Sequence, residues 1–430
     1  GMMILYDMFN KRDDVWCERL FSPWTDLDKI MREEHIPLFT LESQDPVKEF
    51  DFLGITLGYE MCYTNVLQLL DLSGIPLLAK ERTEDDPLVI GGGACAYNPE
   101  PLAPFFDLFY IGEGEMVYGA LFDAYKANQK AGGSRQDFLL KAAQIPGIYV
   151  PSLYQVTYKE DGTIKSFQPK YENVPEKIEK QLVIDMDKDY NKLEAPVVPH
   201  IKATQDRVTL EIQRGCIRGC RFCQAGMIYR PTRERDIETL KESARIMLQK
   251  TGHEEISLSS LSSSDYSHLK EIVNFLIDEF RDEAVNISLP SLRIDAFALD
   301  VMSKVQDVKK SSLTFAPEAG SQRLRNVINK GLTEEDISYL NELTTIQNES
   351  DITRRERMID LIKWRWLEDK TFDKVFDIET LLAYYLQLCI IERWTELNEQ
   401  IGEETFRSIV ATLKRESNRS LEEFKRNQKK

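Results

Sequence analysis

The chain has 430 residues, a length typical of two or three domains, and 42% of its residues are hydrophobic, enough to fill ordinary globular cores. Its formal net charge of -17 excludes the general positive field of a protein that coats nucleic acid, so nucleic acid is not indicated as a partner. No apolar run is long enough to span a bilayer and no signal segment opens the chain, so we expect a cytoplasmic protein whose seven cysteines are reduced.

Residues 2–150 alternate strand-like and helix-like segments, the pattern of a Rossmann-like, doubly wound α/β domain with a parallel sheet. Short apolar runs predict strands at 51–57, 87–90 and 107–111. Apolar spacing predicts helices at 3–9, at 61–72 and from just after Glu115 to about Asn128. The glycines that follow the second and third strands are expected at the carboxyl edge of the sheet, where ligand crevices form.

Residues 151–205 are predicted to form a small hairpin and a linker, because two strand-like runs flank Asp161-Gly162 and a polar stretch with prolines follows. Residues 206–332 return to strand–helix alternation, with strands expected at 208–212, 255–261, 285–289 and 312–316. Helices are expected at 237–249, 268–280 and 323–329. Strand–helix units that follow one another in this way indicate part of a (βα) barrel.

Residues 337–430 show no further strand pattern and are predicted to form a separate α-helical module with a basic tail. Three of the five tryptophans, Trp364, Trp366 and Trp394, lie in this module. We interpret them either as the core of a small helical bundle or as a surface that binds a protein partner.

Three cysteines within eight residues form the most specific pattern in the sequence. Cys216, Cys220 and Cys223 come directly after the expected strand at 208–212, with the spacing C-x3-C-x2-C. Three thiolates on one short loop can hold three irons of a [4Fe–4S] cluster and leave the fourth iron open to a small molecule. A structural zinc site is the alternative, but it requires four ligands, and neither His200 nor His253 lies near the loop in sequence.

The cysteine spacing, with the aromatic Phe222 before the third cysteine, resembles the signature of the radical S-adenosylmethionine (radical SAM) superfamily. The resemblance implies a partial barrel, a [4Fe–4S] cluster on the three cysteines, SAM as a second cofactor and an external electron donor. It also implies that SAM is chelated by the open iron and cleaved reductively to a 5′-deoxyadenosyl radical, which abstracts hydrogen from a substrate that the sequence does not identify. Because the cofactors carry this chemistry, the expected task of the protein is to orient SAM and exclude water.

The same resemblance suggests cofactor-binding roles for Phe222 and for polar residues that follow two of the strands. Ser259 and Ser260 close the strand at 255–261, where related proteins often carry a glycine-rich turn for the SAM amino group. Glu318 and Ser321 follow the strand at 312–316 and resemble a segment that contacts the SAM ribose. The alternative for the last pair is that Ser321 caps a helix while Glu318 lies in solvent. No residue is predicted to be catalytic.

Arginines are concentrated around the cysteines, at Arg214, Arg218, Arg221, Arg230, Arg233 and Arg235. Guanidinium groups bind carboxylates in forked geometry, so one or two of them could hold the SAM carboxylate or an anionic substrate. The alternative is that they pair with acidic side chains on the protein surface.

Residues 2–332 as a whole resemble an uncharacterised family of radical SAM proteins that carry a cobalamin-binding-like domain ahead of the barrel. The supporting stretches are 21–24, 91–101, Gly112-Glu-Gly-Glu115 and 224–231. The D-x-H-x-x-G loop that would supply a histidine ligand to cobalamin is absent, and none of the four histidines lies in such a context. The domain could bind cobalamin without a histidine ligand, but binding of another ligand or support of the barrel alone is the favoured expectation.

The barrel pattern stops early, at about residue 332, and the N-terminal domain lacks the strand expected before its first helix. Residues 362–369, 384–390 and 392–394 resemble the carboxyl end of a bacterial family associated with V-type ATPase operons, so the chain would join parts of two proteins. Two functional hypotheses follow. The first is a radical SAM enzyme, and the second is a non-catalytic iron–sulfur or fusion protein whose C-terminal helices mediate protein–protein interaction.

Overall fold

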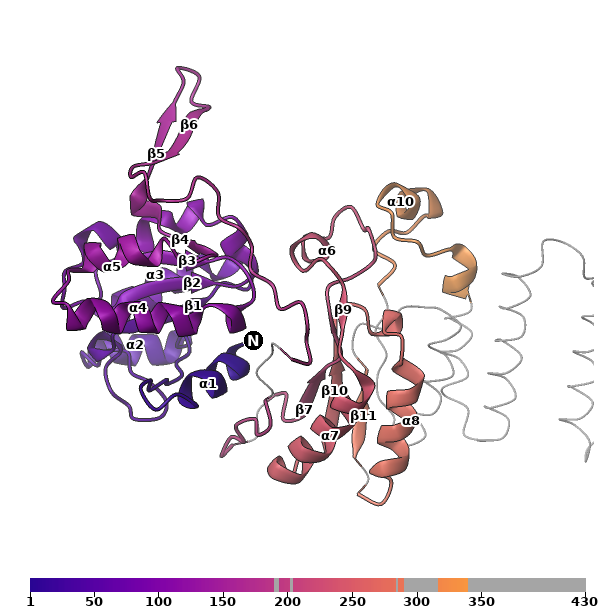
Figure 1. The fold of residues 1–430 in the computed structure, drawn as a ribbon. Helices are drawn as coiled ribbons and strands as arrows, with labels where there is room; N and C mark the ends of the chain where they lie inside the picture. The colour runs from indigo at the N-terminus through magenta and orange to yellow at the C-terminus, as the bar shows by residue number, and fades with distance from the viewer. Residues whose placement is uncertain (189–192, 202–203, 284, 290–315, 339–430) are drawn as a thin grey trace, which may run out of the picture. The chain divides into compact units, whose positions relative to one another are not determined.

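The computed structural model describes residues 1–188, 193–201, 204–283, 285–289 and 316–338 (Figure 1). The chain divides into two compact units, residues 1–291 and residues 292–430. The first unit holds two parallel-stranded sheets and the three clustered cysteines, and the second is described over residues 316–338.

A four-stranded sheet organises the N-terminal part of the first unit. Its strands lie in chain order, β1 (Phe52–Thr56), β2 (Leu88–Gly92), β3 (Leu108–Tyr110) and β4 (Ile148–Tyr149). The first three run parallel, as the strand–helix alternation predicted, whereas β4 pairs antiparallel with β3. All of β3 and nearly all of β2 are buried, which is typical of parallel strands covered on both faces.

Five α-helices accompany this sheet: α1 (Met2–Asn10), α2 (Thr25–Glu33), α3 (Tyr63–Leu72), α4 (Tyr118–Lys130) and α5 (Arg135–Ala142). The three helices predicted for this part of the chain correspond to α1, α3 and α4. Ser134 caps α5 in a capping box, in which its own N–H donates to Asp137 Oδ2 at 2.9 Å. Short 3-10 helices complete the connections: η1 (Val47–Glu49), η2 (Glu60–Cys62), η3 (Ala79–Glu81), η4 (Ala94–Tyr97), η5 (Glu100–Phe105), η6 (Gly114–Met116) and η7 (Pro151–Leu153).

Aromatic side chains fill the core between the sheet and its helices. Phe106, Phe109 and Tyr110 are each at most 2% exposed. Gly91 of β2 packs so closely on Phe109 that a Cβ atom there would lie 2.6 Å from the ring. A larger residue at this position would displace the ring, so the glycine of the 91–93 run is explained by packing within the sheet.

A buried carboxylate, Asp107, lies beside this core at the start of β3. Its Oδ2 accepts hydrogen bonds from Arg82 Nη1 at 2.7 Å and from Val89 N at 2.8 Å. Arg135 Nη2 lies 2.9 Å from the same oxygen. Two arginines thus neutralise one buried acid, which removes most of the cost of burying its charge.

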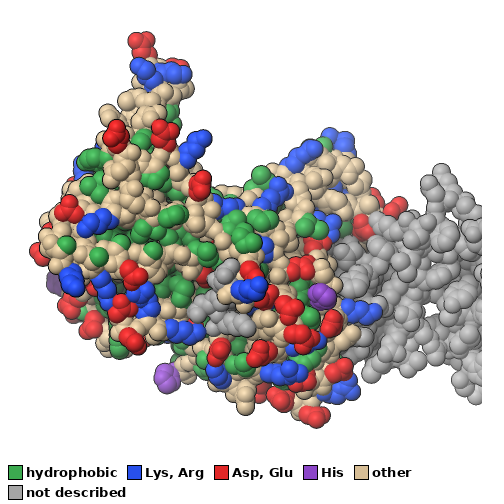
Figure 2. Space-filling view, in the orientation of Figure 1, with side chains coloured by type: hydrophobic (Ala, Val, Ile, Leu, Met, Phe, Trp, Pro, Cys, Tyr) green, Lys and Arg blue, Asp and Glu red, His purple; other side chains and the backbone are tan. Residues whose placement is uncertain are grey.

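A two-stranded hairpin projects from this part of the unit, where Asp161-Gly162 predicted one (Figure 1). In it, β5 (Tyr154–Tyr158) pairs antiparallel with β6 (Ile164–Pro169). Gly162 has a φ of +79°, the left-handed conformation that the turn requires. Figure 2 shows charged side chains gathered at the hairpin tip, where residues 159–161 are exposed.

The second sheet has three parallel strands in the order β11 (Asn286–Ser288), β10 (Glu255–Ser259) and β7 (Val208–Glu211). Helix α7 (Ile237–Thr251) leads into β10, α8 (Leu269–Glu279) leads into β11, and the two helices pack on each other. One further turn of 3-10 helix, η8 (Ser263–Asp265), follows β10. The predicted strand–helix repetition is confirmed over these three strands. The fourth expected strand, 312–316, lies outside the described residues except for its last position.

Helix α7 shows how local sequence sets the ends of these elements. Asp236 caps its N-terminus, because Asp236 Oδ2 accepts from the backbone N–H groups of Glu238 and Thr239. The helix ends at Gly252, whose φ of +69° places it in the left-handed region. These end signals, and not the apolar spacing alone, fix where the helix begins and ends.

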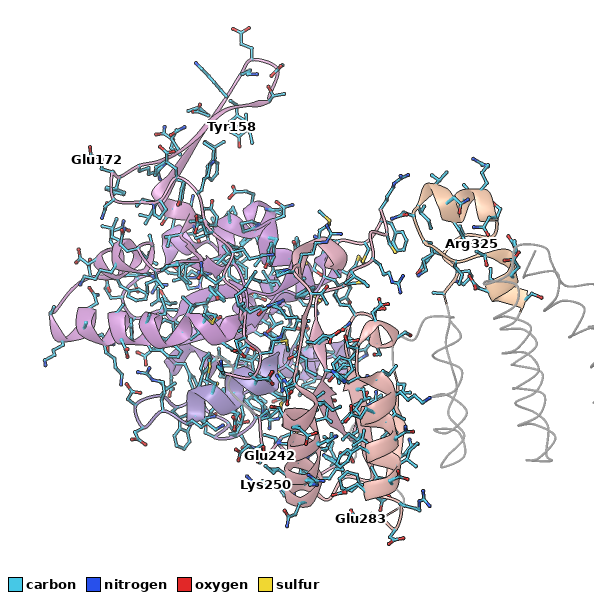
Figure 3. All side chains as sticks on the ribbon, turned by 45° about the vertical axis from the view of Figure 1, so that its right-hand side comes forward. Tyr158, Glu172, Glu242, Lys250, Glu283 and Arg325 are labelled. Carbon is cyan, nitrogen blue, oxygen red and sulfur yellow. The ribbon has the colours of Figure 1, made fainter. Side chains whose placement is uncertain are left out.

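The described part of the second unit is organised around one buried arginine. Arg325 lies on α10 (Gln322–Val327) and is 1% exposed (Figure 3). It donates from Nε to Leu332 O at 3.0 Å and from Nη1 to Ala319 O at 3.0 Å, and it pairs with Glu334. The helical module expected at 337–430, with its three tryptophans, lies outside the described residues from position 339 onward.

A search of the described helices for a membrane span finds none with both the length and the apolar character to cross a bilayer.

Candidate functional site

The three clustered cysteines lie on one closed loop, residues 215–232, which we call the cysteine loop. Two short strands pair antiparallel at its base: β8 (Gln213–Arg214) and β9 (Arg233–Glu234). We call these four residues the neck. Within the loop is one short helix, α6 (Ala225–Ile228). The loop follows β7, so its neck lies at the carboxyl edge of the parallel sheet, where sites of this fold class form.

Gly215, the first residue of the loop, shows how closely the two limbs approach. Its φ is +84°, and a Cβ there would lie 2.7 Å from the carbonyl oxygens of both Tyr229 and Pro231. Only glycine therefore fits at this position without moving the returning limb. From the linker, Lys180 Nζ donates to Ile228 O at 3.0 Å and to Arg230 O at 2.9 Å, which ties down that limb.

The three predicted ligand residues, Cys216, Cys220 and Cys223, lie on this loop as partly exposed free thiols, and their role as cluster ligands stays a prediction. The Cys223 N–H donates to Cys220 O at 3.1 Å, and the Gly226 N–H donates to Cys223 Sγ at 3.3 Å. An amide hydrogen bond to sulfur is one of the contacts by which a protein tunes a bound iron–sulfur cluster. The predicted cofactor residue Phe222 lies between them in sequence with 52% of its surface exposed.

Three thiols on one short loop are a donor set that suits an iron–sulfur cluster, because a cubane cluster takes each cysteine on a different iron. Among the described residues, no group of three His, Cys, Asp or Glu side chains lies close enough to hold one metal ion. A loop with three accessible thiols and one amide donor to sulfur is compatible with such a cluster.

A serine-rich turn follows β10 at the same edge of the sheet. Ser259 is the last residue of β10, and its carbonyl oxygen accepts from Ile212 N at 3.1 Å. The Ser260 hydroxyl accepts from Ser262 N at 3.1 Å and lies 3.0 Å from Ser263 Oγ. The Ser259 carbonyl and the Ser260 side chain thus hold the turn, and the predicted contact of both residues with SAM stays a prediction.

Two polar atoms beside this turn are buried without a hydrogen-bond partner. Gln213 of the neck donates from Nε2 to Ser262 O at 2.9 Å, while Gln213 Oε1 and Ser262 Oγ have no partner. Both residues are at most 3% exposed. Because buried polar atoms are almost always paired, such a pair at the carboxyl edge of a sheet suits a polar ligand or a bound water.

Glu113, from the Gly112-Glu-Gly-Glu115 stretch, bonds to both strands of the neck. Its Oε2 accepts hydrogen bonds from Arg214 Nη1 at 3.0 Å and from Arg233 Nη1 at 2.9 Å. Its Oε1 lies 2.8 Å from Arg233 Nη2. The side chains of the three residues are each at most 10% exposed. A residue from the segment that follows β3 of the first sheet thus closes the base of a loop that leaves the second sheet.

Two more carboxylates extend this charge network on the Arg214 side. Arg214 Nη2 lies 2.5 Å from Glu115 Oε1 and 2.9 Å from Glu211 Oε2. Arg233 instead donates to backbone carbonyls, from Nη1 to Val183 O at 2.7 Å. Glu113 is therefore the carboxylate that the two neck arginines share.

The charge state of this network follows from its geometry. Burial raises the pKa of Glu113, but the hydrogen bond from Arg233 and the charge of Arg214 outweigh burial, so the pKa lies below its ordinary value of 4.5. Burial, aided by the charge of Glu113, raises the pKa of Tyr97 to about 12. Tyr97 belongs to η4, which packs against α6 of the cysteine loop. Near neutral pH, the loop therefore meets a carboxylate anion and an uncharged phenol from the first sheet.

The outer part of the loop is held by a second ion pair. Arg218, between the first two cysteines, pairs through both Nε and Nη2 with Asp265, which follows the serine turn. Sequence reasoning placed the arginines either on a ligand or in surface pairs. The structure pairs Arg214, Arg218 and Arg233 with carboxylates of the chain itself, and it buries Arg233 at 7% exposure.

Glu318 and Ser321 belong to the second unit and are described there alone. Ser321 caps α10, with its hydroxyl accepting from Leu324 N at 3.4 Å. Glu318 is exposed, has a φ of +65° and accepts from Lys330 Nζ at 3.2 Å. This is the helix-cap arrangement that the sequence left open as the alternative. Contact of either residue with SAM stays a prediction.

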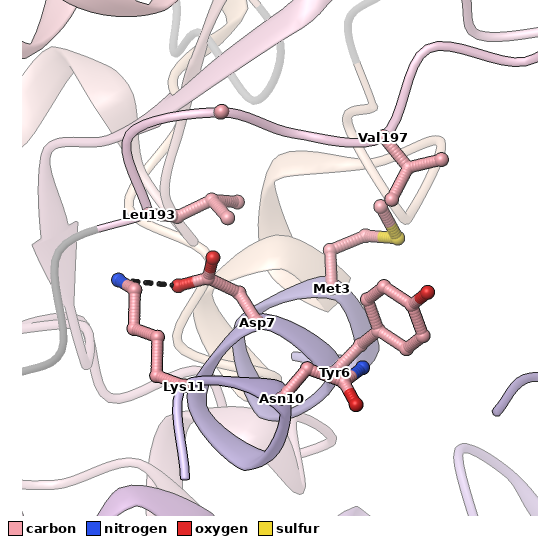
Figure 4. A pocket seen from close by; sticks show the side chains of 8 residues that line it. Met3, Tyr6, Asp7, Asn10, Lys11, Leu193 and Val197 are labelled. Atoms are coloured by element: carbon pink, nitrogen blue, oxygen red, sulfur yellow. Dashed lines mark ion pairs between the residues drawn. The ribbon is translucent and has the colours of Figure 1, made fainter. Parts of the chain in front are cut away.

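A cavity of about 140 Å³ lies elsewhere, between α1 and the linker (Figure 4). Its lining includes Tyr6, Asp7 and Lys11 from α1 and Val197 from the linker, and Asp7 pairs with Lys11 at 2.7 Å. None of the predicted site residues lines it. The linker residues 189–192 beside it lie outside the described part of the chain, so we assign this cavity no role.

Sequence reasoning missed Glu113 and Asp265 as partners of the cysteine loop. Glu113 lies in a stretch that was noted only for its resemblance to a family, and Asp265 had no signal beyond its position after the serine turn. The excess of arginines around the cysteines was the available clue, because guanidinium groups near a fold's centre require carboxylates.

Comparisons with known proteins bear on the family of the N-terminal part of the chain. Residues 1–151 match a family model described as radical SAM proteins, N-terminal. That family implies a [4Fe–4S] cluster and SAM as cofactors. Residues 256–417 match a family model described as protein of unknown function DUF2764.

Among curated proteins, an uncharacterized protein of Methanocaldococcus jannaschii is 32% identical over 320 residues, which are 71% of this chain and 58% of the relative. The chain thus spans little more than half the length of that relative. A putative methylthiotransferase of the same organism is 27% identical over 135 residues, 30% of each protein.

Three solved structures show a more distant likeness. Two are of the radical SAM methyltransferase TsrM from Kitasatospora setae. The one with tryptophan and a SAM analogue is 13% identical, with a TM-score of 0.39 over 70% of this chain and 54% of that chain. The one with cobalamin and a [4Fe–4S] cluster is 12% identical, with a TM-score of 0.40, and covers 71% of this chain and 54% of that chain. The third is the cobalamin-dependent SAM radical enzyme OxsB with aqua-cobalamin. It is 14% identical, with a TM-score of 0.44, and covers 76% of this chain and 42% of that chain. Scores below 0.5 do not establish a shared fold.

Proposed function

We propose that this chain is a radical SAM protein that binds a [4Fe–4S] cluster through Cys216, Cys220 and Cys223 and binds SAM at the open iron. The observation that carries the proposal is the cysteine loop: three free thiols on one loop that follows a strand of a parallel sheet and is held at its base and at its outer part. The match of residues 1–151 to a radical SAM family model supports it from a different part of the chain.

When bound, the cluster and SAM would supply one-electron chemistry that removes a hydrogen atom from a substrate. The residues of the chain hold and orient these groups. Gly226 N donates to the Cys223 sulfur at 3.3 Å, a hydrogen bond of the kind that tunes a bound cluster. The serine turn, with Ser259, Ser260 and the unpaired oxygens of Gln213 and Ser262, offers polar atoms that we assign to SAM. Phe222, Glu318 and Ser321 are proposed as further cofactor contacts, on the family resemblance alone.

Anaerobic reconstitution with iron and sulfide tests the proposal. We expect about four irons per chain and a reduced-state electron paramagnetic resonance signal that changes when SAM is added. Replacing Cys216, Cys220 and Cys223 by alanine should abolish both. The matched control replaces the other described cysteines, Cys17, Cys62 and Cys95, and should retain them. Equal loss of iron in both variants, or stoichiometric zinc in place of iron, would contradict the proposal.

A second candidate is a non-catalytic iron–sulfur or fusion protein whose C-terminal module binds a protein partner, and the DUF2764 match supports only the fusion of two families in one chain. This match starts at residue 256, at the beginning of β10, and so includes two of the three strands of the second sheet. The formation of 5′-deoxyadenosine after reduction discriminates the two. An enzyme forms it from SAM, whereas a protein that only holds the cluster does not.

A further inference from the structure

The neck of the cysteine loop is too short to close the loop by its own hydrogen bonds. It pairs two residues with two, Gln213 with Glu234 and Arg214 with Arg233. Isolated two-stranded ribbons are marginal in water even when they are much longer. The limbs also carry two guanidinium groups side by side at Arg214 and Arg233, which repel each other unless a carboxylate lies between them.

Glu113 lies between those guanidinium groups and comes from a different sheet. It bonds to Arg214 at 3.0 Å and to Arg233 at 2.9 Å, one from each strand of the neck. The same carboxylate oxygen accepts from Val183 N at 2.9 Å, which fixes the linker against the neck. One side chain therefore joins both limbs of the loop, and its removal leaves two buried cations that share no anion.

We propose that Glu113 is a positioning residue for the cysteine loop. By holding Arg214 and Arg233 together, Glu113 keeps the neck closed and thereby fixes the spacing of the three cysteines. Its negative charge also lowers the electrostatic potential at the loop. Cys216 lies only two residues beyond Arg214, so a change at the neck reaches the first ligand directly. The effect of Glu113 on the redox potential rests on the proposed function, because it requires a bound cluster. The closure of the neck rests on the hydrogen bonds of Glu113 alone.

Asp107 provides a matched control within the same sheet. It too is a buried carboxylate between two arginines, Arg82 at 2.7 Å and Arg135 at 2.9 Å. It has the same general role in stability, but its contacts lie within the N-terminal part of the unit and include no residue of the neck. The substitution Asp107→Asn therefore reports what the loss of a shared buried anion does to stability alone.

The first experiment uses the full-length apo protein. We expect Glu113→Gln to increase hydrogen exchange of peptides covering residues 215–232 by about a factor of ten or more, because the buried pairs that close the neck are weakened. Alkylation of Cys216, Cys220 and Cys223 should accelerate, while that of Cys95 should not. Asp107→Asn should increase hydrogen exchange in β2 and β3, while hydrogen exchange and alkylation of the cysteine loop stay at the wild-type rates. Loop exchange and alkylation that are unchanged in Glu113→Gln would overturn the inference.

The second experiment uses reconstituted protein and reads the midpoint potential of the cluster by redox titration with paramagnetic resonance. Glu113→Gln should raise the potential because it removes a negative charge near the cluster, and Glu113→Asp, which keeps the charge, should return it toward the wild-type value. A potential that is the same in the wild type and in Glu113→Gln would overturn the redox part. If the wild type assembles no cluster, the proposed function fails, while the apo experiment still decides whether Glu113 positions the loop.

Discussion

Arg218 and Asp265 form a two-point ion pair that joins the cysteine loop to the turn after β10. Arg218 Nε donates to Asp265 Oδ2 at 3.0 Å, and Arg218 Nη2 pairs with Oδ1. Asp265 is the buried partner, with 5% of its side chain exposed. The forked geometry fixes both the position and the orientation of the segment between the first two cysteines.

We expect Asp265→Asn to lower the free energy of unfolding by about 1–3 kcal/mol, because it removes a charge-assisted bond at a carboxylate that is 5% exposed. Iron content after reconstitution should fall as well. Asp278→Asn is the control, since Asp278 pairs with Arg281 where both side chains are 71% exposed, and it should change stability by less than about 1 kcal/mol. Urea denaturation of both variants measures the difference. Equal effects would show that the Arg218 pair does not hold the loop.

Two glycine substitutions, one in the cysteine loop and one outside it, test whether the limbs of the loop pack as closely as the structure shows. Gly215→Ala and Gly252→Ala both place alanine at a positive φ, +84° and +69°. At Gly252 nothing lies within 4 Å of the new Cβ, so only the backbone penalty of about 1–2 kcal/mol applies. At Gly215 the Cβ would lie 2.7 Å from two carbonyl oxygens, so we expect a clearly larger loss of stability and a loss of bound iron.

Acid should weaken the neck in the apo protein. The pKa of Glu113 is lower in the folded chain than its ordinary value of 4.5, because the bonds and charges of Arg233 and Arg214 outweigh burial. A group of this kind stabilises the folded state above its ordinary pKa, and the contribution is lost as the pH falls through the folded pKa. Stability should therefore decrease below about pH 4.5, and Glu113→Gln should decrease less steeply. If the unfolding free energies of the wild type and Glu113→Gln fall in parallel as the pH decreases, Glu113 does not carry the negative charge that we assign to it.

Ser321 allows the helix cap and the proposed cofactor contact to be separated. Ser321→Ala should lower the stability of α10 by about 0.5–2 kcal/mol, because the hydroxyl accepts from Leu324 N. Ser321→Asp keeps a good capping group and should retain that stability. If Ser321 also contacts SAM, both variants should weaken the SAM-dependent change in the resonance signal. A wild-type SAM response in Ser321→Asp would restrict this residue to capping.

The sequence by itself determined which residues carry the candidate chemistry and where most of the longer strands and helices lie, although α2 and α5 were not predicted. The spacing of Cys216, Cys220 and Cys223 is a local property, because three ligands within one loop are near each other in any fold. The strand and helix positions follow from short-range periodicity, which is why α3, α7 and the three parallel strands of the second sheet lie where it placed them. The edge strand β4 and the neck strands, each only two residues long, are too short to leave a periodic signal.

Only the tertiary structure decided what holds the cysteine loop in place. Glu113 and Arg233 are 120 residues apart in sequence, and Arg218 and Asp265 are 47 apart. An ion pair between distant residues has no local pattern, because any of the many acids in the chain could have been the partner. Burial selects the partner, since a guanidinium group taken out of water requires a carboxylate at bonding distance. The candidate ligands of the proposed site were therefore visible in the sequence, while the residues that hold their loop became visible only once the two sheets were brought together.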